Sequence, residues 1–314
     1  MRKGRDSLDK KKFPVGALFL SLAAFIWGTA FVAQSVGMDY LGPATFNAAR
    51  SFIGGFALLP AALLFLRLDR RKAPKQEEKQ GLWKQYRSLI LGGVLCGVLL
   101  GAGSLLQQTG IQTVSSGKAG FLTALYIVLV PILGCFFKRA PGWKVWVAAV
   151  AALVGIWCLS VQGESFSIAV GDMLLLACAL FFAFHILAVD RVSPDANGIA
   201  LSCIQFFVAG LFSLPFALAM ETPRWGGLLA AWGPLLYTGV LSSGVAYTFQ
   251  ILGQKTTEPT VASLILSLES VFAVLAGWVV LGDTLSPREI VGCVLVFGAV
   301  ILAQLPGRKK AQSL

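Results

Sequence analysis

The chain has 314 residues, of which 56% are hydrophobic and only 13% are charged, and its formal net charge is +11. A soluble protein carries about 25% charged residues, so this composition excludes an ordinary soluble domain. The Lys and Arg residues lie in short segments between apolar runs, as in the loops of a membrane protein, and this distribution argues against a nucleic-acid partner.

Ten apolar runs follow one another along the chain, each close to the ~20 residues that a helix needs to cross the hydrocarbon core. The first run is longer than the ~7–15 residues of a signal-peptide core, so we interpret it as an uncleaved span. The sequence therefore predicts an all-α integral membrane protein with ten transmembrane helices. The predicted spans cover approximately residues 15–36, 44–66, 88–108, 119–137, 143–160, 170–189, 198–219, 233–253, 260–281 and 289–305.

The basic residues between the spans predict an orientation. If alternate loops face opposite sides, 22 of the 26 Lys and Arg lie on the side of the two chain ends, three lie on the other side, and Arg50 lies inside a span. Loops rich in Lys and Arg stay in the cytoplasm. We therefore expect a multi-pass protein of the cell membrane, either the inner or the plasma membrane, with both termini cytoplasmic.

The two halves of the chain resemble each other. A shift of 142 residues places Gln108 on Gln250 and Gly97 on Gly239, and a shift of 155 places Arg50 on Gln205. Spans 1–5 and 6–10 are thus two copies of one unit. Because five is an odd number, the second copy enters the membrane inverted, as in many secondary transporters.

This repeat predicts the organisation of the chain into four segments. They are a basic cytoplasmic N-terminus (1–14), repeat 1 (15–160) with a charged cytoplasmic loop at 67–87, repeat 2 (170–305) and a basic cytoplasmic tail (306–314).

Four stretches carry a resemblance to a known family, and they match it in order and spacing across both halves. They are FIWGTAFVAQ (25–34), FNAARSFIGG (46–55), SSGKAGFLTALYIVLVPILG (115–134) and the long segment from Thr257 to Leu302. The chain resembles the drug/metabolite transporter (DMT) superfamily, in particular its ten-span type with two EamA domains. The resemblance implies export or exchange of small organic metabolites. The family usually carries Pro directly after the Glu of span 9; here Ser270 stands at that place, which puts an expected kink in doubt.

Polar side chains inside the spans mark the predicted substrate path, because a polar group that faces lipid is costly. On span 1, Trp27, Phe31 and Gln34 share a face, and on span 8 Tyr247 shares one with two glutamines. The predicted substrate and cavity residues are Trp27, Gln34, Asn47, Arg50, Gln108, Gln112, Tyr126, His185, Tyr247, Gln250, Gln254 and Ser270.

Each of these residues has a structural alternative. The glutamines can bond neighbouring helices, Trp27 can be a packing residue, and His185 can be a structural histidine with satisfied hydrogen bonds. The small residues, such as the Gly93–Gly97–Gly101 series, are typical of close helix packing.

Arg50 and Glu269 are charged residues that lie well inside the predicted spans, away from the span ends, where a charge costs about 2.5–3.5 kcal/mol on insertion scales. Arg keeps its proton, so it needs a partner or a wet cavity, whereas Glu269 can also exist in a neutral form. One hypothesis is that a direct contact between the two fixes the fold. The other is that Glu269 couples transport to a proton, or to a cationic group of the substrate.

These features predict a secondary transporter of small metabolites such as amino acids or related neutral, zwitterionic or aromatic solutes, working by alternating access. An exporter of drug-like cations is the alternative, and a channel or a membrane enzyme is less favoured, since the spans contain no catalytic motif. The six cysteines lie in spans without metal-ligand spacing, and we expect no metal and no cofactor. The expected partners are a small-molecule substrate and membrane lipids, with no nucleic acid, and the expected state is a monomer or a weak homodimer.

Overall fold

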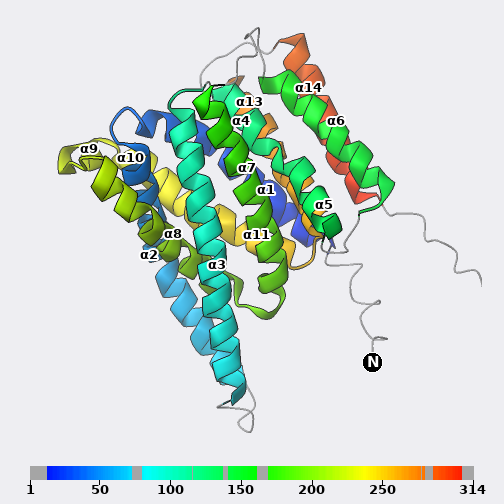
Figure 1. Ribbon diagram of the computed structural model, residues 1–314. Helices are drawn as coiled ribbons and strands as arrows, with labels where there is room; N and C mark the ends of the chain where they lie inside the picture. The colour runs from blue at the N-terminus through cyan, green and yellow to red at the C-terminus, as the bar shows by residue number, and fades with distance from the viewer. Residues whose placement is uncertain are drawn as a thin grey trace, which may run out of the picture.

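The computed structural model describes residues 13–72, 80–114, 116–136, 141–160, 169–276, 278–279 and 286–305. Within these residues all regular structure is helical, and Figure 1 shows the helices packed in one bundle. The helices are α1 (Phe13–Gly37), α2 (Pro43–Lys72), α3 (Gln80–Ile111), α4 (Ser116–Ala124), α5 (Tyr126–Phe136), α6 (Trp143–Ser160), α7 (Val170–Val192), the short turn η2 (Ser193–Asp195), α8 (Gly198–Met220), α9 (Trp225–Ala230), α10 (Trp232–Leu236), the π-helical segment η3 (Tyr237–Ala246), α11 (Tyr247–Gln254), α12 (Pro259–Leu266), α13 (Leu268–Ala276) and α14 (Pro287–Gln304).

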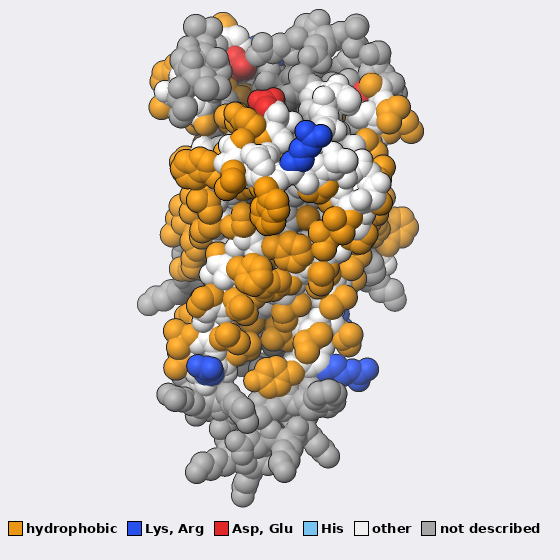
Figure 2. Space-filling model, turned by 90° about the vertical axis from the view of Figure 1, so that its left-hand side faces the viewer, with side chains coloured by type: hydrophobic (Ala, Val, Ile, Leu, Met, Phe, Trp, Pro, Cys, Tyr) orange, Lys and Arg blue, Asp and Glu red, His pale blue; other side chains and the backbone are white. Residues whose placement is uncertain are grey.

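The expected ten spans are present. In the described part of the chain, nine helical stretches are long and apolar enough to cross a membrane, and a tenth, Trp143–Leu159, is slightly shorter. Helix α1 begins and α14 ends at the same end of the bundle, the lower end in Figure 1; we call this end the termini face. Figure 2 shows hydrophobic side chains covering the middle of the face in view, while the Lys, Arg, Asp and Glu side chains seen there lie toward the two ends.

The two inverted repeats are related by the offsets found in the sequence. A Cβ atom on Gly97 of α3 would lie 2.7 Å from the backbone oxygen of Gln205 on α8, and one on Gly239 of η3 would lie 3.1 Å from that of Arg50 on α2. Shifts of 142 and 155 residues interconvert these two contacts. Only glycine lets two backbones approach so closely. The equivalence confirms the fold of two inverted five-helix units.

The packing of whole helices follows the same symmetry. Helix α2 packs along α8, its equivalent in the second repeat, and α6 packs along its own equivalent, α14. Gly155 and Gly292 meet where α6 and α14 cross, each facing the other's backbone oxygen. These two pairs flank the central region, where the remaining helices of the two repeats face each other.

The charged segment 67–87 is more helical than predicted. Helix α2 continues to Lys72 and α3 begins at Gln80, so both helices extend into the segment that was expected to be a loop. Its Lys, Arg, Gln and Glu residues are good helix formers, which allows a helix to continue beyond the apolar part of its span.

Candidate functional site

Spans 4 and 9 are both interrupted near their middle, and they bring two polar side chains together. Span 4 breaks at Leu125, between α4 and α5, and span 9 breaks at Ser267, between α12 and α13. A shift of 142 residues places Leu125 on Ser267, so the two interruptions are equivalents in the two repeats. The Tyr126 hydroxyl donates a 3.1 Å hydrogen bond to Oε1 of Glu269. Both repeats thus contribute to one contact at the centre of the bundle.

The break in span 9 has a local cause that does not require proline. The hydroxyl of Ser263 donates to the backbone oxygen of Thr260 at 2.8 Å, and that of Ser267 donates to Leu264 at 2.7 Å. Serine side chains that bond the preceding turn compete with the helical ladder and bend helices. The backbone N–H of Ser270 then bonds Ser267 three residues back. The interruption therefore lies just before Glu269, although Ser270 replaces the proline usual in the family.

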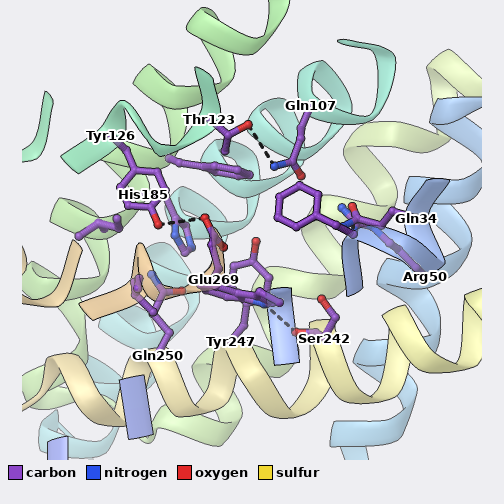
Figure 3. A pocket seen from close by; sticks show the side chains of 15 residues that line it. Gln34, Arg50, Gln107, Thr123, Tyr126, His185, Ser242, Tyr247, Gln250 and Glu269 are labelled. Atoms are coloured by element: carbon purple, nitrogen blue, oxygen red, sulfur yellow. Dashed lines mark hydrogen bonds between the residues drawn. The ribbon is translucent and has the colours of Figure 1, made fainter. Parts of the chain in front are cut away.

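A cavity opens beside this contact, as Figure 3 shows, with side chains from both repeats on its wall. Its volume is about 50 Å³, which is room for a few water molecules at roughly 10–15 Å³ each. The lining residues are Trp27, Phe31, Gln34, Arg50, Gln107, Thr123, Tyr126, Phe182, His185, Ile186, Ser242, Tyr247, Gln250, Leu266 and Glu269.

Arg50 is held on one side of the cavity by neutral side chains. Its Nε donates to Oδ1 of Asn47 at 2.9 Å and its Nη1 donates to Oε1 of Gln34 at 3.0 Å. The Asn47 amide in turn donates to the hydroxyl of Ser213 on α8 at 2.9 Å. The guanidinium is therefore fixed by a chain of hydrogen bonds through α1, α2 and α8.

Arg50 and Glu269 do not form the direct contact considered from the sequence. Both residues are described, both are buried, and each bonds its own neutral partners rather than the other. In Figure 3, Arg50 and Gln34 lie at one side of the cavity, whereas Glu269, Tyr126 and His185 lie toward the other. The cavity thus has one basic and one acidic wall.

Aromatic side chains form much of the remaining wall. The rings of Trp27 and Tyr247 lie 4.5 Å apart between centroids, and the indole N–H of Trp27 donates to the backbone oxygen of Ser242 at 3.3 Å. His185 packs edge-on against Tyr247 and shares a 3.1 Å hydrogen bond with Oε1 of Gln205. Ser242 belongs to the π-helical segment η3, and such segments occur frequently at functional sites.

Eight of the thirteen predicted site residues lie on the cavity wall, and their roles remain predictions. They are Trp27, Gln34, Arg50, Tyr126, His185, Tyr247, Gln250 and Glu269.

The other five lie elsewhere. Asn47 sits behind Arg50, Gln108 points to the backbone oxygen of Gln34 at 3.5 Å, and Gln254 bonds the backbone oxygen of Ile186 at 2.9 Å. Ser270 is buried away from the cavity, and Gln112 is exposed just past the last residue of α3.

The misplacement on span 3 has a simple geometric reason. Consecutive helical residues point about 100° apart, and the cavity side of α3 carries Gln107, which donates to the Thr123 hydroxyl at 3.4 Å. The sequence alignment selected its neighbour Gln108 instead. Phe182, also missed, was visible in the sequence as the equivalent of Trp27 under the shift of 155 residues.

The site offers no metal-binding arrangement. In the described segments, no three His, Cys, Asp or Glu side chains gather in a group that could hold a metal ion. The carboxylate of Glu269 has tyrosine, histidine and glutamine side chains around it, and these groups suit an organic ligand or a proton.

Comparison with known proteins places this architecture in a family. The pattern of the EamA-like transporter family matches residues 14–161 and again residues 169–305, and the two matches together span nearly the whole chain. The chain belongs to the EamA-like transporter family. The expected resemblance to the DMT superfamily is thereby confirmed, and the protein is a multi-pass membrane protein whose family consists of transporters rather than enzymes.

Individual relatives agree with this assignment. The chain is 32% identical over 289 residues to an uncharacterized transporter of Archaeoglobus fulgidus, covering 92% of this chain and 85% of that one. It is 27% identical to the uncharacterized transporter YwfM of Bacillus subtilis, over 94% of this chain and 95% of the relative. It is also 29% identical over 212 residues to the threonine/homoserine exporter RhtA of Escherichia coli K12, covering 67% of this chain and 68% of RhtA.

A solved crystal structure shares the fold. It superimposes with a TM-score of 0.73 at 18% sequence identity, and the match covers 92% of this chain and 96% of the other. At this identity the likeness concerns the fold.

Proposed function

We propose that the protein is a secondary transporter that moves small organic metabolites, amino acids and related zwitterionic or aromatic solutes foremost, through the central cavity by alternating access. The observation that carries this proposal is the cavity itself. It lies at the interface of two inverted repeats, and its wall joins a basic side, an acidic side and aromatic rings. Transporters built from inverted repeats bind their substrates at such an interface.

The cavity volume supports a cycle with at least two conformations. Small-molecule sites typically measure about 300–1,000 Å³, whereas the volume here is about 50 Å³. Substrate binding therefore requires the helices around the cavity to separate. The near-equivalent packing of the two repeats supplies two similar ways of doing so, one toward each face of the membrane.

Glu269 is the residue we assign to coupling. It is 6% exposed, and its carboxyl group is bonded by Tyr126 across the interface between the repeats. A carboxyl group that is shielded from water in one conformation of the cavity and exposed to water in another can take up a proton in the first and release it in the second. Glu269 thus binds a proton, or the cationic group of a substrate, as the cavity alternates.

The orientation follows from the charge bias of the loops. We place the termini face in the cytoplasm and the protein in the cell membrane. Tags attached to the two chain ends are then protected from membrane-impermeant reagents in intact cells and are labelled once the membrane is opened. Labelling of either tag in intact cells would contradict this placement.

The deciding experiment is counterflow in proteoliposomes. Liposomes with purified protein are loaded with one of the twenty common amino acids and diluted into a trace of the same labelled compound. We expect transient accumulation that saturates with concentration and disappears without internal substrate. Flux that rises linearly and does not depend on internal substrate indicates a channel.

A second candidate function is export of drug-like cations. The observation that favours it is the position of Glu269 within a wall that includes the aromatic rings of Tyr126, Trp27 and Tyr247, since aromatic faces attract cations. Labelled tetraphenylphosphonium in the same counterflow assay separates the two functions. Counterflow of this cation with none of any amino acid identifies a cation exporter.

A further inference from the structure

Arg50 is a buried cation whose charge is not neutralised by any of the residues that the structure describes. It is 7% exposed and lines the cavity, and its acceptors are the side-chain oxygens of two neutral amides, Gln34 and Asn47. Among the described residues no carboxylate forms an ion pair with it. A buried charge without a counter-ion is unfavourable, so its presence at the cavity calls for an explanation outside the fold.

The hydrogen-bond chain around Arg50 orients the guanidinium and leaves donors unused. Arginine has five N–H donors in a planar fork, and the protein engages Nε and one N–H of Nη1. The remaining donors belong to the end of the side chain that is farthest from the backbone. A planar guanidinium that is held at Nε and at one N–H of Nη1, with N–H donors of Nη1 and Nη2 left at its tip, matches the two oxygens of a carboxylate.

The two-fold symmetry shows that the helix packing does not need this charge. The residue equivalent to Arg50 is Gln205, and the backbone oxygens at both positions meet a glycine of the facing helix, Gly239 and Gly97 respectively. The same backbone contact forms with a neutral side chain in the second repeat. The positive charge in the first repeat therefore serves the cavity rather than the scaffold.

We propose that Arg50 binds the carboxylate of the transported solute and selects for solutes that carry one, while Glu269 on the other side of the cavity accepts the solute's ammonium group. Asn47, Gln34 and Ser213 are positioning residues that hold the guanidinium fork. This inference rests on the proposed transport of amino acids, and it adds the orientation of the solute and the group that selects it.

The test uses a pair of solutes that differ only in the carboxylate. The amino acid with the strongest counterflow in the wild-type protein is compared with the amine formed by removing its carboxyl group. We expect the wild-type protein to transport the amino acid at least tenfold better than the amine. In Arg50→Gln, which installs the residue of the equivalent position, the apparent KM for the amino acid rises about 10- to 100-fold, as for loss of a charge-assisted hydrogen bond. Transport of the amine does not fall.

Two further variants separate positioning from folding. Arg50→Lys retains the positive charge but lacks the planar pair of N–H donors. Compared with Arg50→Gln, it therefore restores part of the preference for the amino acid over the amine. Asn47→Ala leaves the charge and loosens the fork, and we expect it to raise the KM for the amino acid about three- to tenfold with kcat little changed. Gln205→Ala, at the position equivalent to Arg50, is the matched control and leaves the ratio of amino acid to amine transport unchanged.

The outcomes distinguish the inference from the function on which it rests. If no amino acid shows counterflow, the proposed substrate class is wrong and this inference falls with it. A second outcome is that amino acids are transported but Arg50→Gln lowers amino acid and amine transport by the same factor. If this variant also has the elution volume in size-exclusion chromatography and the Tm of the wild type, the carboxylate assignment alone is overturned. If Arg50→Gln does not fold, Arg50→Lys decides: an unchanged KM for the amino acid in Arg50→Lys overturns the carboxylate assignment as well.

Discussion

Arg50, on the cavity wall, and Gln205, which bonds the wall residue His185, occupy equivalent helix positions but differ in their chemistry. Arg50 lies seven residues after the start of α2, and its equivalent Gln205 lies seven residues after the start of α8, at the opposite end of the bundle. Arg50 bonds Gln34 and Asn47, and Asn47 in turn bonds Ser213. Gln205 bonds His185 through Oε1, and its Nε2 has no partner among the described residues.

Several buried polar atoms without a hydrogen-bond partner among the described residues lie on the Gln205 side, toward the termini face. These atoms lie on α8, on α11 and in the segments next to them. They belong to Ser193, Ser202, Gln205, Gln250, Gln254 and Thr257. Nearly all buried polar groups in proteins are hydrogen-bonded, and these atoms have no partner among the described residues, so this side is the less tightly held. Symmetry thus governs the scaffold, while the residues that we propose to meet solute and proton are specific to each repeat.

The largest effect is expected at the contact that joins the two repeats. Replacing Glu269 by Gln keeps the shape and the possible bond with Tyr126 but removes the ionisable group. We expect accumulation driven by an imposed pH gradient to be lost in proteoliposomes, by a factor of ten or more, while counterflow persists at saturating amino acid concentrations. Tyr126→Phe, which leaves the carboxyl group in place, is the control and retains accumulation. Wild-type accumulation in the Gln variant makes Glu269 a structural residue.

The next effect tests the scaffold, where the two repeats should respond alike. A Cβ atom in Gly97→Ala would meet the backbone oxygen of Gln205 at 2.7 Å and the Cβ of Val208 at 2.5 Å. Because a backbone cannot move aside cheaply, we expect a loss of about 3 kcal/mol in unfolding free energy, at the upper end of overpacking costs. It is measured as a lower Tm in detergent. Gly239→Ala should act in the same direction.

Gly298 of α14 provides the control for this pair, because nothing lies within 4 Å of a Cβ atom added there. Gly298→Ala should be neutral or raise the stability by about 0.5–1 kcal/mol, as alanine does in a helix. Equal Tm values for all three variants would show that the close approach of the helices is not needed for stability.

The third effect contrasts one pair of equivalent positions, Asn47 and Ser202, which the shift of 155 residues relates. Asn47 bonds both Arg50 and Ser213, so Asn47→Ala should cost about 2 kcal/mol, as for loss of a bond to a charged group. The Ser202 hydroxyl is buried without a partner, so Ser202→Ala should be neutral or slightly stabilising. Thermal unfolding of both variants in one detergent gives the comparison, and similar losses would show that the Ser202 side is held as tightly.

The helices and their pairing could be predicted from the sequence because the signals are long and additive. Ten apolar runs define the spans, and the glycines that align under fixed shifts mark where the backbones meet, since only glycine tolerates that approach. The charge bias between loops, which predicts the orientation, is likewise summed over whole segments and does not depend on a single residue.

The contacts of single side chains could not be predicted in this way, because they depend on helix rotation and on interruptions. The break at Ser267 comes from serine side chains that bond the preceding turn, and no proline announces it. The pairing of Tyr126 with Glu269 depends on both interrupted helices and has no signal in either segment alone. The network of Asn47 and Ser213 around Arg50 joins positions 166 residues apart.

The smallest effect separates two glutamines that the sequence treats as equivalent. Gln250 lies on the cavity wall, whereas Gln108 lies off it and its Nε2 points to the backbone oxygen of Gln34 on α1 through a long 3.5 Å contact. Gln250→Ala should raise the KM for the transported amino acid about three- to tenfold, as expected for loss of one hydrogen bond of about 1 kcal/mol. Gln108→Ala should stay within about twofold, since that range corresponds to only ~0.4 kcal/mol and the contact is too long to be strong. Gln107→Ala, next to Gln108 and facing the cavity, is the control for the rotation of α3 and should resemble the Gln250 variant. If Gln108→Ala impairs transport and Gln107→Ala does not, α3 presents its other face to the solute when the cavity opens, and the two repeats are then more alike in function than in this conformation.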